Sequence, residues 1–578
     1  MNPLRSSLLA LEGAWRRLWQ ALDQPAVARA AAWLVPLAFG LLSLARGQDD
    51  NWDLHNYHFY NPYALMNGKI GLDLAPGQWQ SYFNPTLDLL YYGLNRVLPA
   101  PAVGFVMGWL HGLNFVLLLA LARLLLDRGA HRLALLLALA GCLGPGFLSE
   151  LGNTMGDNLT SLCVLGALLL LLQAWSQLAS SKALPVALLA GLVMGAGCGL
   201  KLTNATYAVA LCLALLGVRG GLLRRVRAAF VFGVGVLGGI GITAGHWYWR
   251  MWQQFGNPLF PQFNDRFHAA LAAPIGIGDT GWLPKGWAER LLWPFIFTLH
   301  PQRVIEISMT QLIWPMLYLA FLALAVRALR AAILGQLPAL TPRRQRIGFL
   351  LVFCALAYLG WLNLFGIYRY LVPLELLAPL ALWLVAHRLM PAQVARGVAG
   401  YALLLAAVAI WPVSNWGHAG WARAAARADV PPITAPAQSM VITVQGDPPL
   451  GWMVQFFPRE LAFVSLGSGF PESAAYARRV ADMMAARSGP MYVMLTASGA
   501  EPDVAPPEQR EAALQHQADL VRRARVILDR YGITLHDDSC QIYSAYVGSS
   551  RQPYQLCRIT PPAPASGVTS GVSSGIVP

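Results

Sequence analysis

Long apolar segments recur along this chain and constrain its fold more than any other feature. Of the 578 residues, 56% are hydrophobic and only 12% are charged, about half the charged fraction of an ordinary soluble protein. Several apolar segments are long enough to cross a bilayer as a helix. The sequence therefore predicts a polytopic α-helical membrane protein. Eleven spans are expected, at about residues 31–46, 101–122, 133–148, 158–174, 183–199, 203–218, 229–246, 311–326, 347–365, 370–386 and 398–413.

The basic residues predict how these spans are oriented. Lys and Arg gather in cytoplasmic loops of membrane proteins, and the clusters at 123–132, 224–227 and 343–346 all fall on one side if the N-terminus is inside and the C-terminus outside. Arg46, at the outer end of the first span, is an exception. This distribution accounts for the net charge of +14 without a nucleic-acid partner. Because no short apolar core precedes a small-residue cleavage site, no cleaved signal peptide is expected.

The chain beyond residue 424 predicts a separate outer domain. Strand-like and helical segments alternate there, which is typical of a small α/β domain, and Cys540 and Cys557 suit a disulfide if the domain is extracytoplasmic. We therefore expect a transmembrane domain (1–424, with periplasmic loops 47–100 and 247–310), an α/β domain (425–560) and a disordered tail (561–578).

The stretch from Gln48 to Gly68 is unusual for a membrane protein. It holds three aspartates, two histidines and several aromatic residues directly after the first span. If it is helical, Asp53, Tyr57 and Tyr60 share one face, which would place a carboxylate among aromatic rings where it could accept a proton from a hydroxyl. Aromatic residues also gather at membrane interfaces for purely physical reasons.

Other polar residues lie at the outer ends of later spans. Asp157 opens a span, where a helix cap is the ordinary interpretation. Lys201 lies in a tight outer turn, and its position against the orientation rule indicates a specific anion partner. Arg369 begins the tenth span, and its planar guanidinium suits phosphate. Glu375 lies inside that span, where an ionised acid is costly, so it is either paired, with Arg369 as one candidate, or functional.

The first outer loop resembles that of bacterial GT-C glycosyltransferases that use lipid-linked sugars. Asp53 is followed by Tyr57 and Gly68, and the loop continues to Tyr82-Phe83-Asn84-Pro85. Many relatives have two adjacent acids, whereas the second position here is Leu54, so Asp50 is the candidate substitute. The resemblance covers this loop and, in outline, the plan of eleven spans with an outer C-terminal domain. The family also tends to place an acid near Asp157, a lysine near Lys201 and an Arg-Tyr pair before a proline in a late span.

The resemblance implies a fold and a function. The fold is GT-C-like, N-in and C-out, in the bacterial inner membrane. The function is transfer of a sugar from a polyprenyl-phosphate donor to a hydroxyl of a glycan, lipid or protein acceptor, on the periplasmic face, by direct displacement with Asp53 as the base. The residues expected to bind substrate are Asp50, His55, Tyr57, Tyr60, Asp157, Lys201, Asn204, His246, Arg250, Tyr368, Arg369 and Glu375.

Other interpretations remain open from the sequence. A transporter or flippase for a lipid-linked saccharide would use Glu375 as a pathway residue, and a non-enzymatic envelope assembly factor would use the outer domain to bind a partner. No Cys or His spacing indicates a structural metal site. No cofactor is expected, although the sequence leaves a divalent metal ion open.

Overall fold

The computed structural model describes residues 3–178, 184–217, 221–336, 341–444, 446–497 and 506–562. The expected disordered tail lies almost entirely outside these residues. The chain forms two compact units. We call Met1–Leu54, Asn84–Trp252 and Ile277–Ala425 the membrane unit, and His55–Phe83, Gln253–Gly276 and Ala426–Pro578 the sheet unit. The sheet unit thus combines the C-terminal region with one segment from each of the two long loops.

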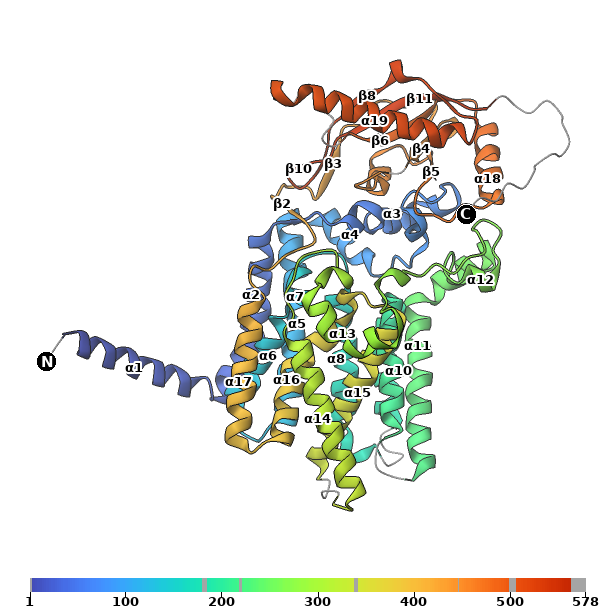
Figure 1. The fold of residues 1–578 in the computed structure, drawn as a ribbon. Helices are drawn as coiled ribbons and strands as arrows, with labels where there is room; N and C mark the ends of the chain where they lie inside the picture. Colours follow the sequence, from blue (N-terminus) through green and yellow to red (C-terminus); the bar gives the residue numbers. More distant parts are fainter. Residues whose placement is uncertain are drawn as a thin grey trace. The chain divides into compact units, whose positions relative to one another are not determined.

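The membrane unit is a bundle of apolar helices (Figure 1). Among the described residues, seven helices are long and apolar enough to cross a membrane, and four more are apolar but shorter. The long helices are α2 (Pro25–Arg46), α5 (Ala100–Leu125), α11 (Leu222–Phe255), α14 (Ile313–Ile333), α15 (Pro342–Leu364), α16 (Val372–Leu389) and α17 (Ala392–Ala409). The shorter helices are α6 (His131–Cys142), α8 (Asp157–Gln173), α9 (Leu184–Leu200) and α10 (Ala205–Leu215). Each expected span falls on one of these helices, which confirms the polytopic helical fold. The orientation stays a prediction.

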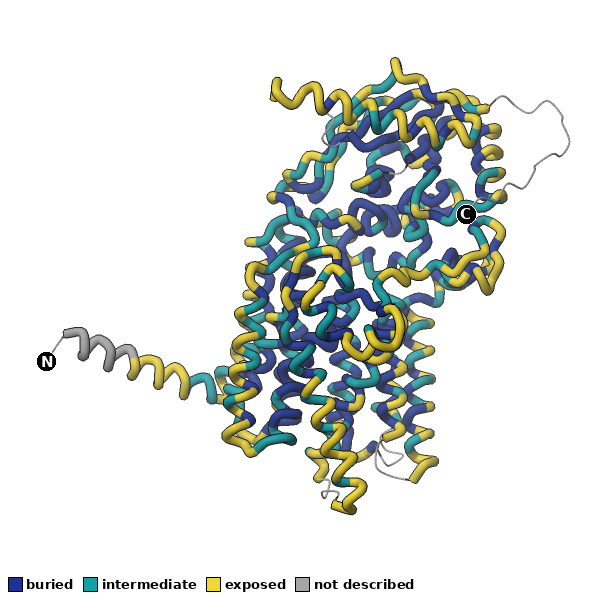
Figure 2. The backbone as a smooth tube through the Cα atoms, in the orientation of Figure 1, coloured by how far each residue is buried: buried dark blue, intermediate teal, exposed yellow. Residues whose placement is uncertain are grey.

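Small residues allow some of these helices to approach closely, as is common in membranes. In α9, an added Cβ at Gly191 or Gly195 would lie 2.1 or 2.0 Å from a carbonyl oxygen of α11. In α5, a Cβ at Gly108 would lie 2.4 Å from the Ser43 side chain of α2. Helix α16 is buried along most of its length (Figure 2), so it forms the centre of the bundle's core.

Shorter elements link the helices on the side of the bundle where the polar residues gather. They include a two-stranded ribbon of β1 (Gln48–Asp49) and β2 (His418–Ala419), helix α4 (Asp88–Val97), the single turn α7 (Pro145–Ser149) and helix α13 (Gly286–Leu299). The sequence predicts a loop over residues 247–310, so helix α13 differs from that prediction. Its Trp293 and Phe297 are buried and explain why this segment is ordered as a helix.

The sheet unit has a six-stranded sheet in which β5-β4-β6-β11-β7 are neighbours and β8 pairs with β11. Its strands are β4 (Met440–Val444), β5 (Ala462–Leu466), β6 (Met491–Thr496), β7 (Thr534–Leu535), β8 (Gln541–Tyr543) and β11 (Tyr554–Thr560). Strand β4 runs parallel to β5 and β6, with Met440 opposite Ala462 and Met491, whereas β11 is antiparallel to β6. Every residue of β4, β5 and β6 is buried, as expected for central parallel strands.

Two helices and a disulfide complete the sheet unit. Helix α18 (Ala474–Ala485) connects β5 to β6, and α19 (Arg510–Asp529) precedes β7. A disulfide joins Cys540 to Cys557. A second sheet has the order β10-β9-β3, from Ser550–Arg551, Ala545–Val547 and Ala426–Ala428.

The two loop segments are joined to the sheet unit by backbone hydrogen bonds. The Leu74 N–H donates to the Phe463 carbonyl oxygen at 2.8 Å, and the Ser465 N–H donates to the Leu74 carbonyl oxygen at 3.0 Å. The Ala273 N–H donates to the Pro471 carbonyl oxygen at 2.8 Å. Helix α3 (Tyr60–Asn67) leads into the first of these segments and ends at Gly68, whose φ of 68° is left-handed, a conformation that glycine adopts without strain.

Candidate functional site

In the membrane unit, Asp53 and Arg369, from the two stretches that stand out most in the sequence, form one ion pair. Asp53 follows strand β1, and Arg369 lies in the 3₁₀ turn Tyr368–Leu371 that opens α16. The Arg369 Nη1 atom donates to Asp53 Oδ2 at 2.9 Å, and the two side chains are 17% and 13% exposed. The guanidinium also lies 5.5 Å from the ring centroids of Tyr370 and Trp416. The aromatic rings restrict its position while leaving part of it open to solvent or ligand.

A second ion pair lies beside the first. The Lys201 Nζ atom is 2.5 Å from Asp157 Oδ2 and donates to the Met155 carbonyl oxygen at 2.7 Å. The Arg369 Nη1 atom lies 3.5 Å from the Met155 sulfur, so Met155 contacts both cations. The four charged residues that the sequence singled out in separate loops therefore form one cluster. We call Asp53, Arg369, Asp157 and Lys201 the charged cluster.

Asp157 has a different local role from the expected helix cap. Gly156 occupies the N-cap of α8 with a φ of 86°, and no side chain caps this end. Asp157 is the first helical residue, so its carboxylate still benefits from the positive end of the helix. Its direct partner is Lys201.

Glu150 is a buried acid that the sequence did not single out as a site residue. Its two carboxyl oxygens have no hydrogen-bond partner among the described residues. Burial raises the pKa of Glu150 well above its usual range, and nearby Asp157 adds to this shift, whereas Lys201 and Arg369 oppose it. The feature of the sequence that could have identified Glu150 as a site residue is its position seven residues before Asp157.

Glu375 is paired, but not with Arg369. Its carboxylate accepts hydrogen bonds from the Gly146 and Phe147 N–H groups at 3.1 and 2.8 Å. It also accepts one from the Tyr368 hydroxyl at 2.5 Å, and Tyr368 in turn accepts from Trp314 Nε1 at 2.8 Å. The Arg369 pairing considered from the sequence is therefore wrong. Glu375 holds the start of α7 against α16, and both Glu375 and Tyr368 are buried.

Three other predicted residues lie at the edges of this region. The Asn204 amide donates to the Gly197 and Lys201 carbonyl oxygens, both at 3.2 Å, and so shapes the turn that carries Lys201. His246 is exposed, and its Nε2 atom lies 3.5 Å from the Thr86 hydroxyl. Arg250 is half-buried, four residues further along α11.

The aspartates before Asp53 shape the loop. Asp49 accepts hydrogen bonds from Asn51 and from both the N–H and the hydroxyl of Thr154, the last two at 2.8 Å. Burial raises the pKa of Asp49, and His418 opposes the shift. The N–H of Asp50 donates to the Gly417 carbonyl oxygen at 3.2 Å. These contacts fix the chain that leads to Asp53.

The condition under which Asp53, Tyr57 and Tyr60 would share one face, a regular α-helix, is not met. Residues Leu54–His58 form a π-helix, whose i→i+5 hydrogen bonds change the angle between residues four apart. His55, Tyr57 and Tyr60 all belong to the sheet unit.

Each of these three rings has its own contact within that unit. The His55 ring lies 5.5 Å from that of Trp452, and the Tyr57 ring lies 5.5 Å from that of Phe83. The Tyr60 hydroxyl donates to Asp73 at 3.2 Å.

No group of three or more His, Cys, Asp or Glu residues positioned to hold a metal ion is found within the described ranges.

The sequence matches no family model and no curated protein, but several solved structures are similar. ArnT from Cupriavidus metallidurans bound to undecaprenyl phosphate is 14% identical, with a TM-score of 0.48 over 92% of this chain and 98% of that chain. An Archaeoglobus fulgidus oligosaccharyltransferase is 15% identical in its complex with zinc and sulfate, with a TM-score of 0.40 over 80% of this chain and 68% of that chain. Its apo form is 12% identical, with a TM-score of 0.42 over 81% and 70%.

Proposed function

We propose that this protein is a membrane glycosyltransferase that moves a sugar from a polyprenyl-phosphate donor to an acceptor hydroxyl. The observation that carries the proposal is the charged cluster, in which a guanidinium and an ammonium group both contact Met155 and each is paired with a carboxylate. The cluster belongs to a bundle of apolar helices, where a lipid-linked donor is available from the bilayer.

Arg369 and Lys201 would hold the donor phosphate. Each keeps part of its side chain exposed, 17% and 18% respectively, so a ligand oxygen can reach it. The planar guanidinium donates two parallel hydrogen bonds to a phosphate. As the bond between the sugar and the phosphate breaks, negative charge grows on the phosphate oxygen, and both cations stabilise it.

Asp53 would act as the base. Its pairing with Arg369 orients the carboxylate, and a phosphate that engages the same guanidinium weakens this pair and frees Asp53 to accept a proton. The acceptor oxygen then bonds to the anomeric carbon, the bond from that carbon to the phosphate oxygen breaks, and the polyprenyl phosphate leaves. The transition state has oxocarbenium character, as in other glycosyl transfer.

Two observations support a periplasmic site in a bacterial inner membrane. The disulfide between Cys540 and Cys557 suits an oxidising compartment. The basic clusters lie in connections that alternate with those carrying the charged cluster, which fits a cytoplasmic location for the basic side. The acceptor is a glycan, lipid or protein hydroxyl.

The test is sugar transfer by purified protein reconstituted in bilayers with an undecaprenyl-phosphate sugar donor. Asp53→Asn keeps the size of the side chain and removes the base, so transfer should fall by about 10²–10⁴-fold. The matched control is Asp482→Asn, at an exposed position of α18, which should transfer at the wild-type rate. Near-normal transfer by Asp53→Asn would remove Asp53 as the base, and absence of transfer by the wild type with every polyprenyl-phosphate sugar supplied would refute the proposed activity.

A further inference from the structure

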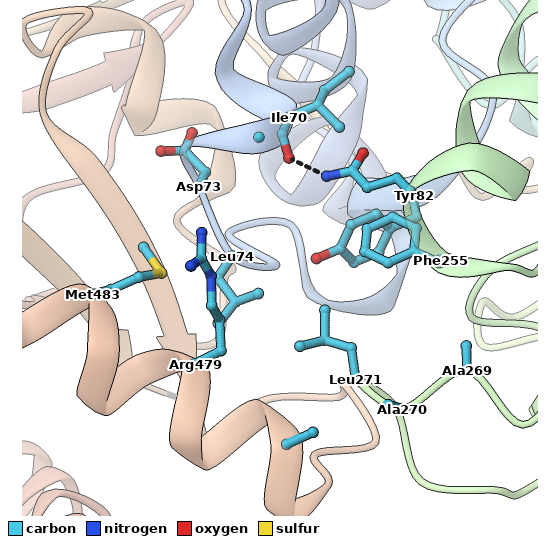
Figure 3. A pocket seen from close by; sticks show the side chains of 13 residues that line it. Ile70, Asp73, Leu74, Tyr82, Phe255, Ala269, Ala270, Leu271, Arg479 and Met483 are labelled. Carbon is cyan, nitrogen blue, oxygen red and sulfur yellow. Dashed lines mark hydrogen bonds between the residues drawn. The ribbon is translucent and has the colours of Figure 1, made fainter.

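The sheet unit contains a pocket of about 370 Å³ that the proposed transfer reaction does not use (Figure 3). Its size falls within the range of small-molecule sites, about 300–1,000 Å³. Three segments that are distant in the sequence line it: residues 70–82, 254–271 and 475–483. All three belong to the sheet unit.

One side of the pocket is apolar and partly aromatic. The rings of Tyr82 and Phe255 lie edge to face with centroids 5.3 Å apart, and Leu74, Leu271 and Met483 continue the wall (Figure 3). Such a surface binds a compact aliphatic or aromatic group through burial of apolar area.

The acid in the pocket wall, Asp73, is already paired with groups of the protein. Asp73 accepts from Lys69 Nζ at 3.0 Å, from the Phe463 N–H at 2.9 Å and from the Tyr60 hydroxyl at 3.2 Å. Its side chain and that of Lys69 are 0% and 1% exposed. Because these partners occupy both carboxylate oxygens, Asp73 offers little charge to a ligand.

A cation at the edge of the pocket is not neutralised in this way. The Arg479 side chain extends from α18 into the pocket (Figure 3), and within the described part of the chain it has neither an ion pair nor a hydrogen bond. Arg487, two residues beyond the end of the same helix, is close enough for the two guanidinium groups to repel. This repulsion adds to the effect of burial in lowering the pKa of Arg487, whereas Asp73 opposes the shift. The polar edge of the pocket is therefore cationic.

We propose that this pocket binds an amphipathic anion, with its phosphate or carboxylate at Arg479 and a compact apolar body against Tyr82, Phe255 and Leu271. An anion at Arg479 would relieve the repulsion from Arg487, and the apolar body would fill space lined by carbon atoms. The proposal is independent of the transfer reaction, because binding is measurable without a sugar donor.

The experiment is calorimetric titration of the full chain in nanodiscs. Phenyl phosphate represents a water-soluble ligand, dihexanoyl phosphatidic acid a lipid, and inorganic phosphate the anion alone. Phenyl phosphate or the phosphatidic acid should bind at least about tenfold more tightly than inorganic phosphate, because each also buries an apolar group. Whichever of the two binds more tightly identifies the source of the ligand.

Two variants with neighbouring controls locate the site. Arg479→Gln should weaken binding of the tighter ligand by about tenfold or more, since it removes the charge-assisted hydrogen bond to the anion. Arg478→Gln, also exposed and one position away, should not change it. Ala475→Trp fills the pocket and should abolish binding, whereas Ala474→Trp lies outside the lining and should retain it.

Three results would overturn the proposal. They are equal binding of inorganic phosphate and both larger ligands, undiminished binding by Arg479→Gln, and no detectable binding of any of the three by the wild type. If Ala475→Trp fails to fold, the Arg479→Gln and Arg478→Gln pair still decides the question.

Discussion

Two ion pairs of nearly equal length have opposite surroundings in the two units. Lys69 and Asp73 are 3.0 Å apart in the sheet unit with side chains 1% and 0% exposed, whereas Arg369 and Asp53 are 2.9 Å apart in the membrane unit and 17% and 13% exposed. Lys69 also donates to the carbonyl oxygens of Arg459 and Leu461.

The difference indicates what each pair does. A fully enclosed pair with all its hydrogen bonds made holds segments of the fold together, and removing one partner leaves a buried charge uncompensated. A partly exposed pair gains little stability from its charges but leaves donors that a ligand can reach. Burial, rather than distance, separates the structural pair from the candidate catalytic pair.

The sharpest test of this contrast is removal of the enclosed cation. Lys69→Ala should destabilise the sheet unit by about 3–5 kcal/mol at pH 7, because Asp73 is left without its partner. Burial already raises the pKa of Asp73 to about 6 while Lys69 is present to oppose the shift. The pKa is higher still without Lys69, so acidification protonates Asp73 in the variant and removes the unpaired charge. The loss of stability relative to the wild type should therefore shrink as the pH falls from 7 to 5. Hydrogen exchange of the β4 and β6 amides measures it.

Arg478→Ala is the control for this variant, because its side chain is exposed, and it should change stability by no more than about 0.5 kcal/mol. A Lys69→Ala penalty that is the same at pH 5 and pH 7 would contradict an ionised Asp73 as its cause.

The disulfide tests whether the stability of the sheet unit is separable from the reaction. Replacing Cys540 and Cys557 together by Ser removes a cross-link between residues 17 apart, which should cost about 3 kcal/mol through greater freedom of the unfolded chain. Hydrogen exchange should show this loss across β8 and β11. At temperatures where the variant stays folded, its rate of sugar transfer should equal that of the wild type, and a reduced rate there would show that the two are coupled.

A smaller effect is expected when Arg369 of the partly exposed pair is replaced by a residue of the same charge and a different shape. Arg369→Lys retains one positive charge and replaces the planar fork. Undecaprenyl phosphate should bind about tenfold more weakly, since one charge-assisted hydrogen bond contributes about 1.5–3 kcal/mol. Arg327→Lys, an exposed position near the end of α14, is the matched control. Unchanged binding by Arg369→Lys would remove Arg369 from the phosphate site.

The smallest effect concerns the edge of the charged cluster. His246 is exposed and has only a 3.5 Å contact with Thr86, so His246→Ala should change the rate of transfer by less than about twofold, in line with the small effects of surface substitutions. Rates measured with saturating and limiting donor would detect a binding role. A loss above tenfold under either condition would place His246 within the reaction site.

Several features of this protein were determined by the sequence alone. The lengths of the apolar segments predicted the helices of the membrane unit, because a helix that crosses a bilayer must be apolar over most of its residues. Strand-like segments that alternate with helical ones beyond residue 424 predicted a small α/β domain, for a similar local reason. Asp53, Lys201 and Arg369 were recognisable because charged residues are scarce in this chain and these three stand at the ends of spans.

Only the tertiary structure decided which of these residues meet. Asp53 and Arg369 are 316 positions apart, and no local pattern specifies a contact over that separation. Glu375 meets Tyr368 and the N–H groups of α7 rather than Arg369, because an acid enclosed by the bundle takes the nearest donors that are enclosed with it. The two loop segments join the sheet unit because their backbone groups pair with those around its strands. The periodicity of apolar side chains indicates which face of a helix or strand is buried. Which residues contact that face depends on how distant helices and strands pack.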